Sequence, residues 1–104
     1  MAKTRGRGLL MAWTDVLPEY EAEFNRWYDE EHVPEKRATK GFYSARRFKH
    51  FTVPHRYLAI YEVENGDLVT NPEYMTQAQS EWSTSIMQAW RDWDRNVWVE
   101  LSAS

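Results

Sequence analysis

One histidine in an aromatic-rich stretch is the side chain of this sequence best suited to acid–base chemistry. Positions i, i+4, i+7, i+8, i+11 and i+12 of this stretch are occupied by Tyr20, Phe24, Trp27, Tyr28, Glu31 and His32. Residues at this spacing share one face of a helix. Imidazole titrates near neutral pH, so it can accept or donate a proton under physiological conditions. The pattern indicates an apolar site with His32 as the acid–base group at its mouth.

The neighbours of His32 act on its charge in opposite directions. A position at a helix C-terminus and the nearby Asp29 favour the protonated ring, whereas burial against aromatic rings favours the neutral one. Asp29 and Tyr28 are the other predicted catalytic residues: Asp29, or else Glu31, would set the tautomer of His32, and Tyr28 would stabilise oxyanion charge. In the alternative interpretation the acids are solvated, Tyr28 belongs to the core, and His32 caps the helix or pairs with an acid without chemistry.

A second set of residues is predicted to bind a substrate. It consists of Trp13, Phe24, Arg46, Tyr61 and Trp82. Aromatic rings line pockets for flat or apolar ligands, but they also fill cores and dimer interfaces, so both uses stay open. Arg46 and Arg47 alternate across a strand, which means that one of them faces the helices and is placed to bind a carboxylate or phenolate.

The sequence offers little for other kinds of catalysis. It contains no cysteine, which excludes disulfides, thiolate metal sites and a cysteine nucleophile. His50 and His55 flank a hairpin turn, and no pair of histidines has the i, i+4 spacing of a helical metal site. No Ser-His-Asp arrangement, phosphate-binding loop or dinucleotide fingerprint is present. We therefore predict neither a metal nor a cofactor.

Length and charge narrow the class of protein. The 104 residues predict a single domain (1–104) whose first residues, 1–7, form a flexible tail. The chain has 13 basic and 16 acidic residues, a net charge of −3, which argues against a nucleic-acid partner. No apolar run approaches the roughly 20 residues of a membrane span, and no secretory signal is evident. A cytoplasmic protein with no membrane partner is expected.

The pattern of apolar residues predicts the element order β-α-β-β-α-β. Strands are expected over residues 8–13, 42–51, 57–64 and 96–101, with the middle two forming a hairpin. The first helix is expected to end just after His32, because Pro34 disfavours helical geometry at the preceding residue. The second helix is expected from the cap-like Asn71-Pro72-Glu73 to about Trp93. This order predicts a ferredoxin-like α+β fold with a four-stranded antiparallel sheet and both helices on one face. A homodimer that pairs sheet on sheet would cover the other face.

Several segments resemble small bacterial proteins near the EthD family, within the dimeric α+β barrel superfamily. The resemblance rests on residues 27–34, 41–48 and 56–62, and also on residues 71–74, Trp82 and residues 95–98. It implies a ligand pocket between the sheet and the two helices of each subunit. It also implies that His32, in the pattern Tyr-x-x-x-His-x-Pro, is the site residue, while it names no substrate because the superfamily hosts many activities.

Together these observations lead to a first hypothesis with open alternatives. The first is a cofactor-independent enzyme that performs proton transfer (isomerase, cyclase, dehydratase or lyase) on a small aromatic or polyketide-like molecule, with His32 as general acid or base. One alternative is a non-catalytic dimeric binding or accessory protein for a hydrophobic ligand. The others are a haem-linked protein and a quinone-forming monooxygenase.

Overall fold

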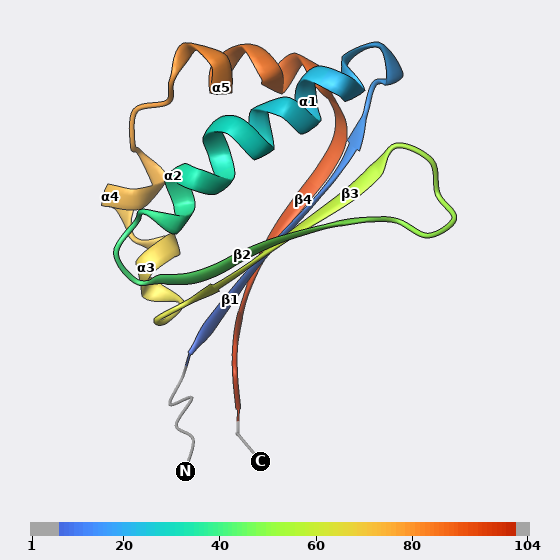
Figure 1. Cartoon of the computed structure of the whole chain (residues 1–104). Coiled ribbons are helices and arrows are strands. Elements are labelled where there is room, and N and C mark those ends of the chain that lie inside the picture. The colour runs from blue at the N-terminus through green and yellow to red at the C-terminus, as the bar shows by residue number, and fades with distance from the viewer. Residues whose placement is uncertain (1–6, 102–104) are drawn as a thin grey trace.

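The computed structural model describes residues 7–101 as an antiparallel sheet covered on one face by short helices (Figure 1). The strands are β1 (Gly8–Val16), β2 (Phe42–Lys49), β3 (Arg56–Val63) and β4 (Trp90–Val99). The helices are α1 (Glu21–Trp27), α2 (Val33–Arg37), α3 (Asp67–Thr70), α4 (Pro72–Met75) and α5 (Glu81–Ile86), with short turns η1 (Pro18–Tyr20), η2 (Tyr28–His32) and η3 (Met87–Ala89). The four strands lie in the order β2-β3-β1-β4 and all pairs are antiparallel. This confirms the predicted ferredoxin-like α+β fold.

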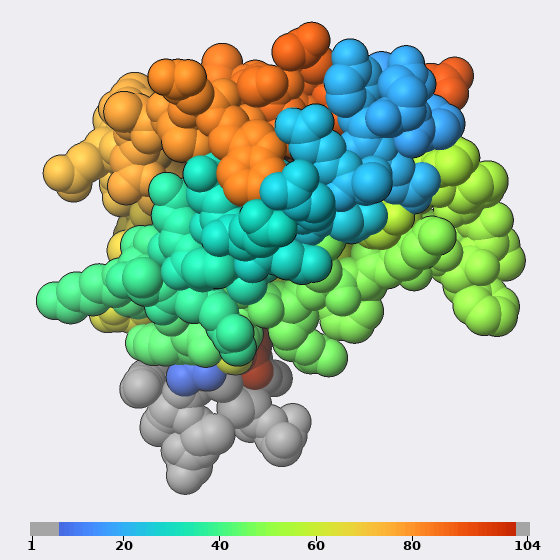
Figure 2. Space-filling view, turned by 45° about the horizontal axis from the view of Figure 1, so that its top comes forward, coloured from blue at the N-terminus to red at the C-terminus, as the bar shows by residue number. Residues whose placement is uncertain are grey.

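The core lies between the sheet and the helices. Side chains alternate along β1, so that Leu10, Thr14 and Val16 are buried toward the helices. Phe24 from α1, Val63 from β3 and Ile86 from α5 have at most 2% of their surface exposed. Figure 2 shows α5 lying along the α1–α2 segment over this core. The packing holds α1 and α5 side by side, as one helical layer on the sheet.

The prediction that Pro34 ends the first helix is wrong. The helix continues through η2, which is a π-helical turn, into α2 and ends at Arg37. Within the turn the backbone N–H of Val33 donates to the carbonyl of Tyr28, five residues earlier. In a regular α-helix the ring of Pro34 would crowd the carbonyl of Glu30 and leave it without a donor. The wider π turn accommodates this proline and lets the helix proceed.

The single long second helix that we predicted is also wrong. Asn71 caps α4 as expected, since its side chain accepts from the N–H of Tyr74 at 2.8 Å. A second cap follows at Ser80, whose hydroxyl accepts from the N–H of Ser83 at 3.0 Å and starts α5. Two caps this close divide the segment into short helices. Strand β4 then begins at Trp90, six residues before the predicted start, because it pairs with the far end of β1.

Only the last residue of the predicted flexible tail, 1–7, lies in the described part of the chain. Arg7 donates to Glu62 at 2.9 Å and its guanidinium lies 4.8 Å from the centre of the Tyr43 ring. Residues 1–6 lie outside the described residues. No helix within residues 7–101 is both long and apolar enough to span a membrane.

Candidate functional site

A cavity of about 300 Å³ lies between the helices and the sheet. Strands β1, β3 and β4 form its floor, and α1, η2, α2, α4 and α5 contribute to its walls and rim. Its aromatic lining includes Trp27, Tyr28, Tyr61, Tyr74 and Trp90. His32 also lines it. The predicted combination of an aromatic cavity and one histidine is therefore present in the fold.

The π turn sets the position of His32. In an α-helix, residues five apart diverge by about 140°, since each residue turns the chain by about 100°. Here the rings of Trp27 and His32 are stacked, with centroids 4.4 Å apart and planes at 22°. The ring of Tyr28 meets His32 edge-on at 5.2 Å, and Tyr61 approaches from β3 at 6.2 Å. Three aromatic rings thus hold the imidazole in one orientation.

Burial keeps the imidazole neutral. It lowers the pKa of His32 from 6.5 to about 3, and the positive charges of Lys36 and Arg47 act in the same direction. Glu31 opposes the shift but does not outweigh the loss of solvation. The sequence left the direction of this shift open, and the structure decides it in favour of the neutral ring. At neutral pH the His32 ring is therefore unprotonated and cannot donate a proton as an acid, and the lowered pKa also makes it a weaker base than free imidazole.

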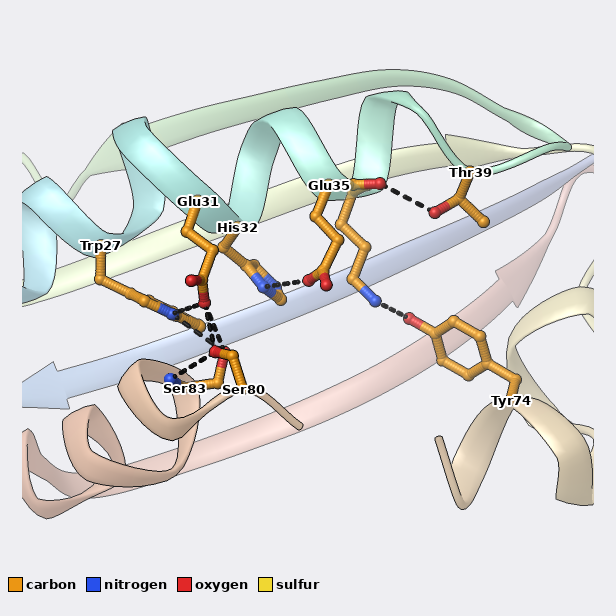
Figure 3. A network of polar contacts seen from close by, with 9 residues as sticks. Trp27, Glu31, His32, Glu35, Thr39, Tyr74, Ser80 and Ser83 are labelled. Carbon is orange, nitrogen blue, oxygen red and sulfur yellow. Dashed lines mark hydrogen bonds and ion pairs between the residues drawn. The ribbon is translucent and has the colours of Figure 1, made fainter. Parts of the chain in front are cut away.

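Two glutamates lie near His32, and they have different roles (Figure 3). The carboxylate of Glu31 accepts hydrogen bonds from Ser80, Ser83 and Trp27, at 2.5, 3.0 and 3.2 Å, which tie the first helix to α5. Glu35 has its Oε1 atom 3.8 Å from His32 Nδ1, within ion-pair range but too far for a hydrogen bond. Glu35 thus approaches His32 Nδ1 without bonding to it, and its side chain is 57% exposed.

Asp29, predicted to act with His32, is not part of this cavity. Its side chain is 73% exposed and lies 3.7 Å from the guanidinium of Arg47. It does not line the cavity, because the π turn directs His32 inward while Asp29 stays on the solvent side. The prediction that Asp29 orients His32 is corrected accordingly.

Three buried side-chain polar atoms within residues 7–101 have no hydrogen-bond partner, and all three belong to residues that line this cavity. They are His32 Nδ1, Tyr61 Oη and Trp90 Nε1. Burial raises the pKa of Tyr61 well above its ordinary value, and the adjacent Tyr28 adds to the effect, so the phenol stays protonated. Burial likewise raises the pKa of Tyr28. Buried polar atoms are rarely left unpaired, and their concentration here marks a place for polar groups of a ligand.

The predicted substrate-binding residues divide into two groups. Tyr61 lines the cavity with its side chain, whereas Phe24, Arg46 and Trp82 do not line it. Trp13 borders the cavity from β1, but by strand register its ring lies on the uncovered face of the sheet, 4.8 Å from the Arg56 guanidinium. Phe24 is fully buried in the core beside the cavity. Trp82 lies on the outer side of α5, where its Nε1 donates to Glu23 at 3.3 Å. Helical spacing alone could not predict that these residues lie outside the cavity. It shows which residues share one face of a helix, but not which part of the protein packs against that face.

Arg46 is the clearest correction. It pairs in register with Ile60 on the uncovered face of the sheet, and its guanidinium lies 5.1 Å from the Phe48 ring centre. Arg47 is the arginine that faces the helices, 4.1 Å from the ring centre of Tyr28, yet it lies behind the cavity rather than in it. The alternation was predicted correctly, but Arg46, the arginine predicted to bind the substrate, is the one that faces away from the helices.

Sequence reasoning missed three polar residues of the cavity: Lys36, Tyr74 and Arg95. Lys36 belongs to the part of the helix that Pro34 was expected to prevent, and Arg95 to the part of β4 that was expected to be helix or loop. Lys36 Nζ donates to the hydroxyl of Tyr74 at 2.7 Å. No local sequence signal brings these residues together, since they come from three separate elements.

The other histidines have local roles. His50 Nδ1 accepts from the N–H groups of Thr52 and Val53 in the hairpin turn, at 3.1 and 2.9 Å. His55 Nδ1 lies 3.0 Å from Glu21 Oε1. Among the residues that the structure describes, no group of three His, Cys, Asp or Glu side chains is arranged to hold a metal ion.

Comparison with known proteins places the fold in a recognised group. Neither protein-family models nor curated proteins match this sequence significantly. A Bordetella bronchiseptica protein with the provisional name antibiotic biosynthesis monooxygenase matches with TM-score 0.74, at 19% identity, over 96% of this chain and 100% of its own. A dimeric ferredoxin-like protein from an uncultured marine organism matches with TM-score 0.71, at 17% identity, over 96% and 92%. A Deinococcus radiodurans protein with the same provisional name as the first matches with TM-score 0.71, at 10% identity, over 93% and 95%.

These similarities show that the chain shares the ferredoxin-like α+β fold of these structures, because they extend over nearly all of each molecule. At such low identities they carry no activity with them. The narrower resemblance to EthD-like proteins remains a prediction.

Proposed function

We propose that this protein is a cofactor-independent enzyme in which His32 acts as a general base on a small aromatic or polyketide-like molecule. The observation that supports it best is a neutral imidazole, held by stacked rings in an aromatic cavity that also contains unpaired donors. The reaction class is proton transfer at a carbon or phenol acidified by a carbonyl or ring: isomerisation, cyclisation, dehydration or lyase cleavage. Because the lowered pKa makes His32 a weak base, proton abstraction requires that donors in the cavity stabilise the anion as it forms.

In this proposal each polar atom around the cavity has one task. With Nδ1 protonated and directed at Glu35, the lone pair of Nε2 is free to take the proton. The 3.8 Å separation would shorten to a hydrogen bond when a ligand completes the site, as is common for catalytic contacts. Tyr61 Oη and Trp90 Nε1 would donate to the carbonyl or phenolate oxygen on which negative charge develops.

Cavity size limits the substrate to small ring systems. A protein cavity of about 150 Å³ holds one benzene molecule. The cavity here, about 300 Å³, is twice that volume and suits one ring with substituents or two fused rings. Such a molecule would lie between the rings of Trp27 and Trp90, which restrict its orientation.

The test uses a bicyclic ketone that needs no cofactor. The protein is incubated with 2-tetralone in D2O, and NMR follows exchange of the α-protons. We expect exchange above the buffer rate, reduced by about 10² or more in His32→Gln. His50→Gln, at an exposed turn, is the matched control and should keep the wild-type rate. Equal exchange by wild type and His32→Gln would refute the role of His32.

A quinone-forming monooxygenase is the second candidate, favoured by the provisional names of two structural neighbours. The same proton abstraction from a phenol would generate the electron-rich anion that reacts with O2. For 1-naphthol the balance is one naphthol and one O2 to one 1,4-naphthoquinone and one water. An oxygen electrode and the absorbance of the quinone decide this candidate, and His32→Gln should suppress both signals if it holds.

A binding or accessory protein would use the same cavity without chemistry. In that case His32→Gln would leave ligand affinity unchanged, and neither deuterium exchange nor oxygen uptake would exceed the rate in buffer. Detection of turnover that depends on His32 excludes this alternative.

We also propose that the protein works as a homodimer paired through its uncovered sheet face. That face carries Leu9, Met11, Phe48, Leu58, Ile60 and Trp98, according to strand alternation and register. Two of these side chains are strongly exposed, Phe48 at 39% and Trp98 at 55%. An apolar sheet face of this kind marks an interface, and a structural neighbour is described as dimeric.

A further inference from the structure

The basic residues of this protein show an uneven pattern of pairing. Five of those in residues 7–101 are half-buried: Arg7, Lys36, Arg47, Arg56 and Arg95. Three of them have a carboxylate within ion-pair distance: Arg7 has Glu62, Arg47 has Asp29 and Arg56 has Asp15. The other two, Lys36 and Arg95, have no such partner in the described part of the chain, and both line the cavity. Half-buried charge is costly unless it is compensated.

Both cations flank the same ring at one end of the cavity. Lys36 Nζ lies 4.6 Å from the centre of the Tyr74 ring and the Arg95 guanidinium 5.9 Å from it. Their remaining contacts are neutral, because Lys36 donates to the Tyr74 hydroxyl and Arg95 to the carbonyl of Val69. Figure 3 shows that Tyr74 and the Ser80–Ser83 pair lie on opposite sides of His32.

The charged side chains that line the cavity are positive, although the protein as a whole is acidic. Within residues 7–101, the side chains lining the cavity include Lys36 and Arg95 but no aspartate or glutamate. The two glutamates beside His32 have other partners: Glu31 is bound by two serines and Trp27, and Glu35 faces His32. The protein has a net charge of −3, yet the charged side chains that line this end of the cavity are both positive.

From this arrangement we infer that the ligand carries a carboxylate, which Lys36 and Arg95 bind beside Tyr74. The inference rests on the proposed function, since it names the substrate class of the same cavity. Ammonium and guanidinium donors form charge-assisted hydrogen bonds with carboxylates. Lys36 follows His32 by four residues, about 6 Å along the helix axis. The bound carboxylate and the proton taken by His32 would therefore lie on different parts of one small ring compound.

The test compares two molecules of the same shape that differ in charge. Isothermal titration calorimetry at pH 7 measures the binding of 2-naphthoate and of its neutral amide, 2-naphthamide. We expect the carboxylate to bind at least about tenfold more tightly, as for hydrogen bonds to charged groups. Lys36→Gln and Arg95→Gln keep a donor but remove the charge; each should reduce this preference, and together they should abolish it. Arg37→Gln, an exposed neighbour on α2, should leave it unchanged.

The failures of the two proposals are distinguishable. Equal binding of acid and amide overturns the carboxylate site, and so does a preference that persists in the double variant or absence of binding by folded protein. None of these results concerns the exchange of neutral 2-tetralone, on which the role of His32 rests. Conversely, a charge preference that depends on Lys36 and Arg95, without exchange either at 2-tetralone or at a 2-tetralone that carries a ring carboxylate, supports the carboxylate site and removes the catalytic role.

Discussion

At the scale of the residue, His32 shows how an environment selects one role for a versatile side chain. Trp27, Tyr28 and Tyr61 surround the imidazole and remove it from water, which costs the charged form far more than the neutral form. Lys36, one helical turn away, disfavours a second positive charge. The consequence is an imidazole that stays unprotonated over the whole neutral range.

The depressed pKa predicts that acid destabilises the protein through His32. In the unfolded chain the imidazole binds a proton below pH 6.5, whereas in the folded protein it does so only below about 3. Between these values the unfolded state holds more protons, so stability falls as the pH falls. From pH 7 to 4.5 this loss is about 2–3 kcal/mol.

Urea unfolding at both pH values measures this loss. His32→Gln lacks the group, so its stability should fall less over the same interval, by about that amount. Identical pH dependence of wild type and His32→Gln would show that the imidazole is not neutral in the folded state.

Tyr61 and Tyr57 form a matched pair for testing the unpaired hydroxyl. Both lie on β3 and face the helices, but only Tyr57 is bonded, to Glu21 at 2.5 Å and Asn25 at 3.2 Å. Tyr61→Phe removes an unsatisfied buried group and should stabilise the protein by about 1 kcal/mol. Tyr57→Phe should destabilise it by about the same amount. Denaturant unfolding gives both values, and destabilisation by Tyr61→Phe would reveal a partner for that hydroxyl.

At the scale of the element, the π turn η2 determines which side chains reach the cavity. It adds one residue to a turn, so that the helices on either side keep their orientation while Trp27 and His32 come to stack. Pro34 favours this geometry because it cannot donate to the carbonyl of Glu30. The position of the His32 side chain thus follows from the need to accommodate Pro34 in the helix.

Because the π turn contains one extra residue, deleting a residue inside it should disturb the fold less than deleting one from the regular helix before it. In a Pro34→Ala background, removal of the exposed Glu30 should convert the π turn to regular α-helix and leave both flanking segments in place. Removal of the exposed Arg26 should instead rotate buried Phe24 relative to Trp27 by about 100°. Circular dichroism should show cooperative thermal unfolding for the first variant and its loss for the second. Equal disruption by the two deletions would contradict the bulge.

At the scale of the whole molecule, the sheet separates two surfaces, the cavity on one face and an apolar patch on the other. The helix-covered face holds the core and the cavity, and the uncovered face carries the apolar side chains of the proposed dimer interface. Strand β4 contributes an exposed tryptophan to each side, Trp93 at the cavity and Trp98 on the uncovered face. These two residues are chemically identical and similarly exposed, so the same substitution at each of them tests the two surfaces separately.

Trp98→Glu should convert a dimer into a monomer, because it buries a charge in an apolar interface. Trp93→Glu should leave the dimer intact. Sedimentation velocity at several protein concentrations measures both. A monomeric wild type, or dimers in both variants, would show that the uncovered face does not pair two copies.

The sequence by itself determined the order of strands and helices, the ferredoxin-like fold and the shared face of Tyr28 and His32. These follow from apolar periodicity and helical spacing, which are local properties and can be read along the chain. Local cues were less reliable where they competed with packing. Pro34 did not stop the helix, and the segment before Trp93 became two short helices followed by the early start of β4.

Only the tertiary structure decided the charge of His32, the choice between Arg46 and Arg47, and the meeting of Lys36, Tyr74 and Arg95. Each depends on which distant elements lie against a side chain and how much water they exclude. A pKa depends on the burial of the group and on charges across the cavity, and neither quantity has a sequence period. The chain specifies a helix face, but the fold determines what that face meets.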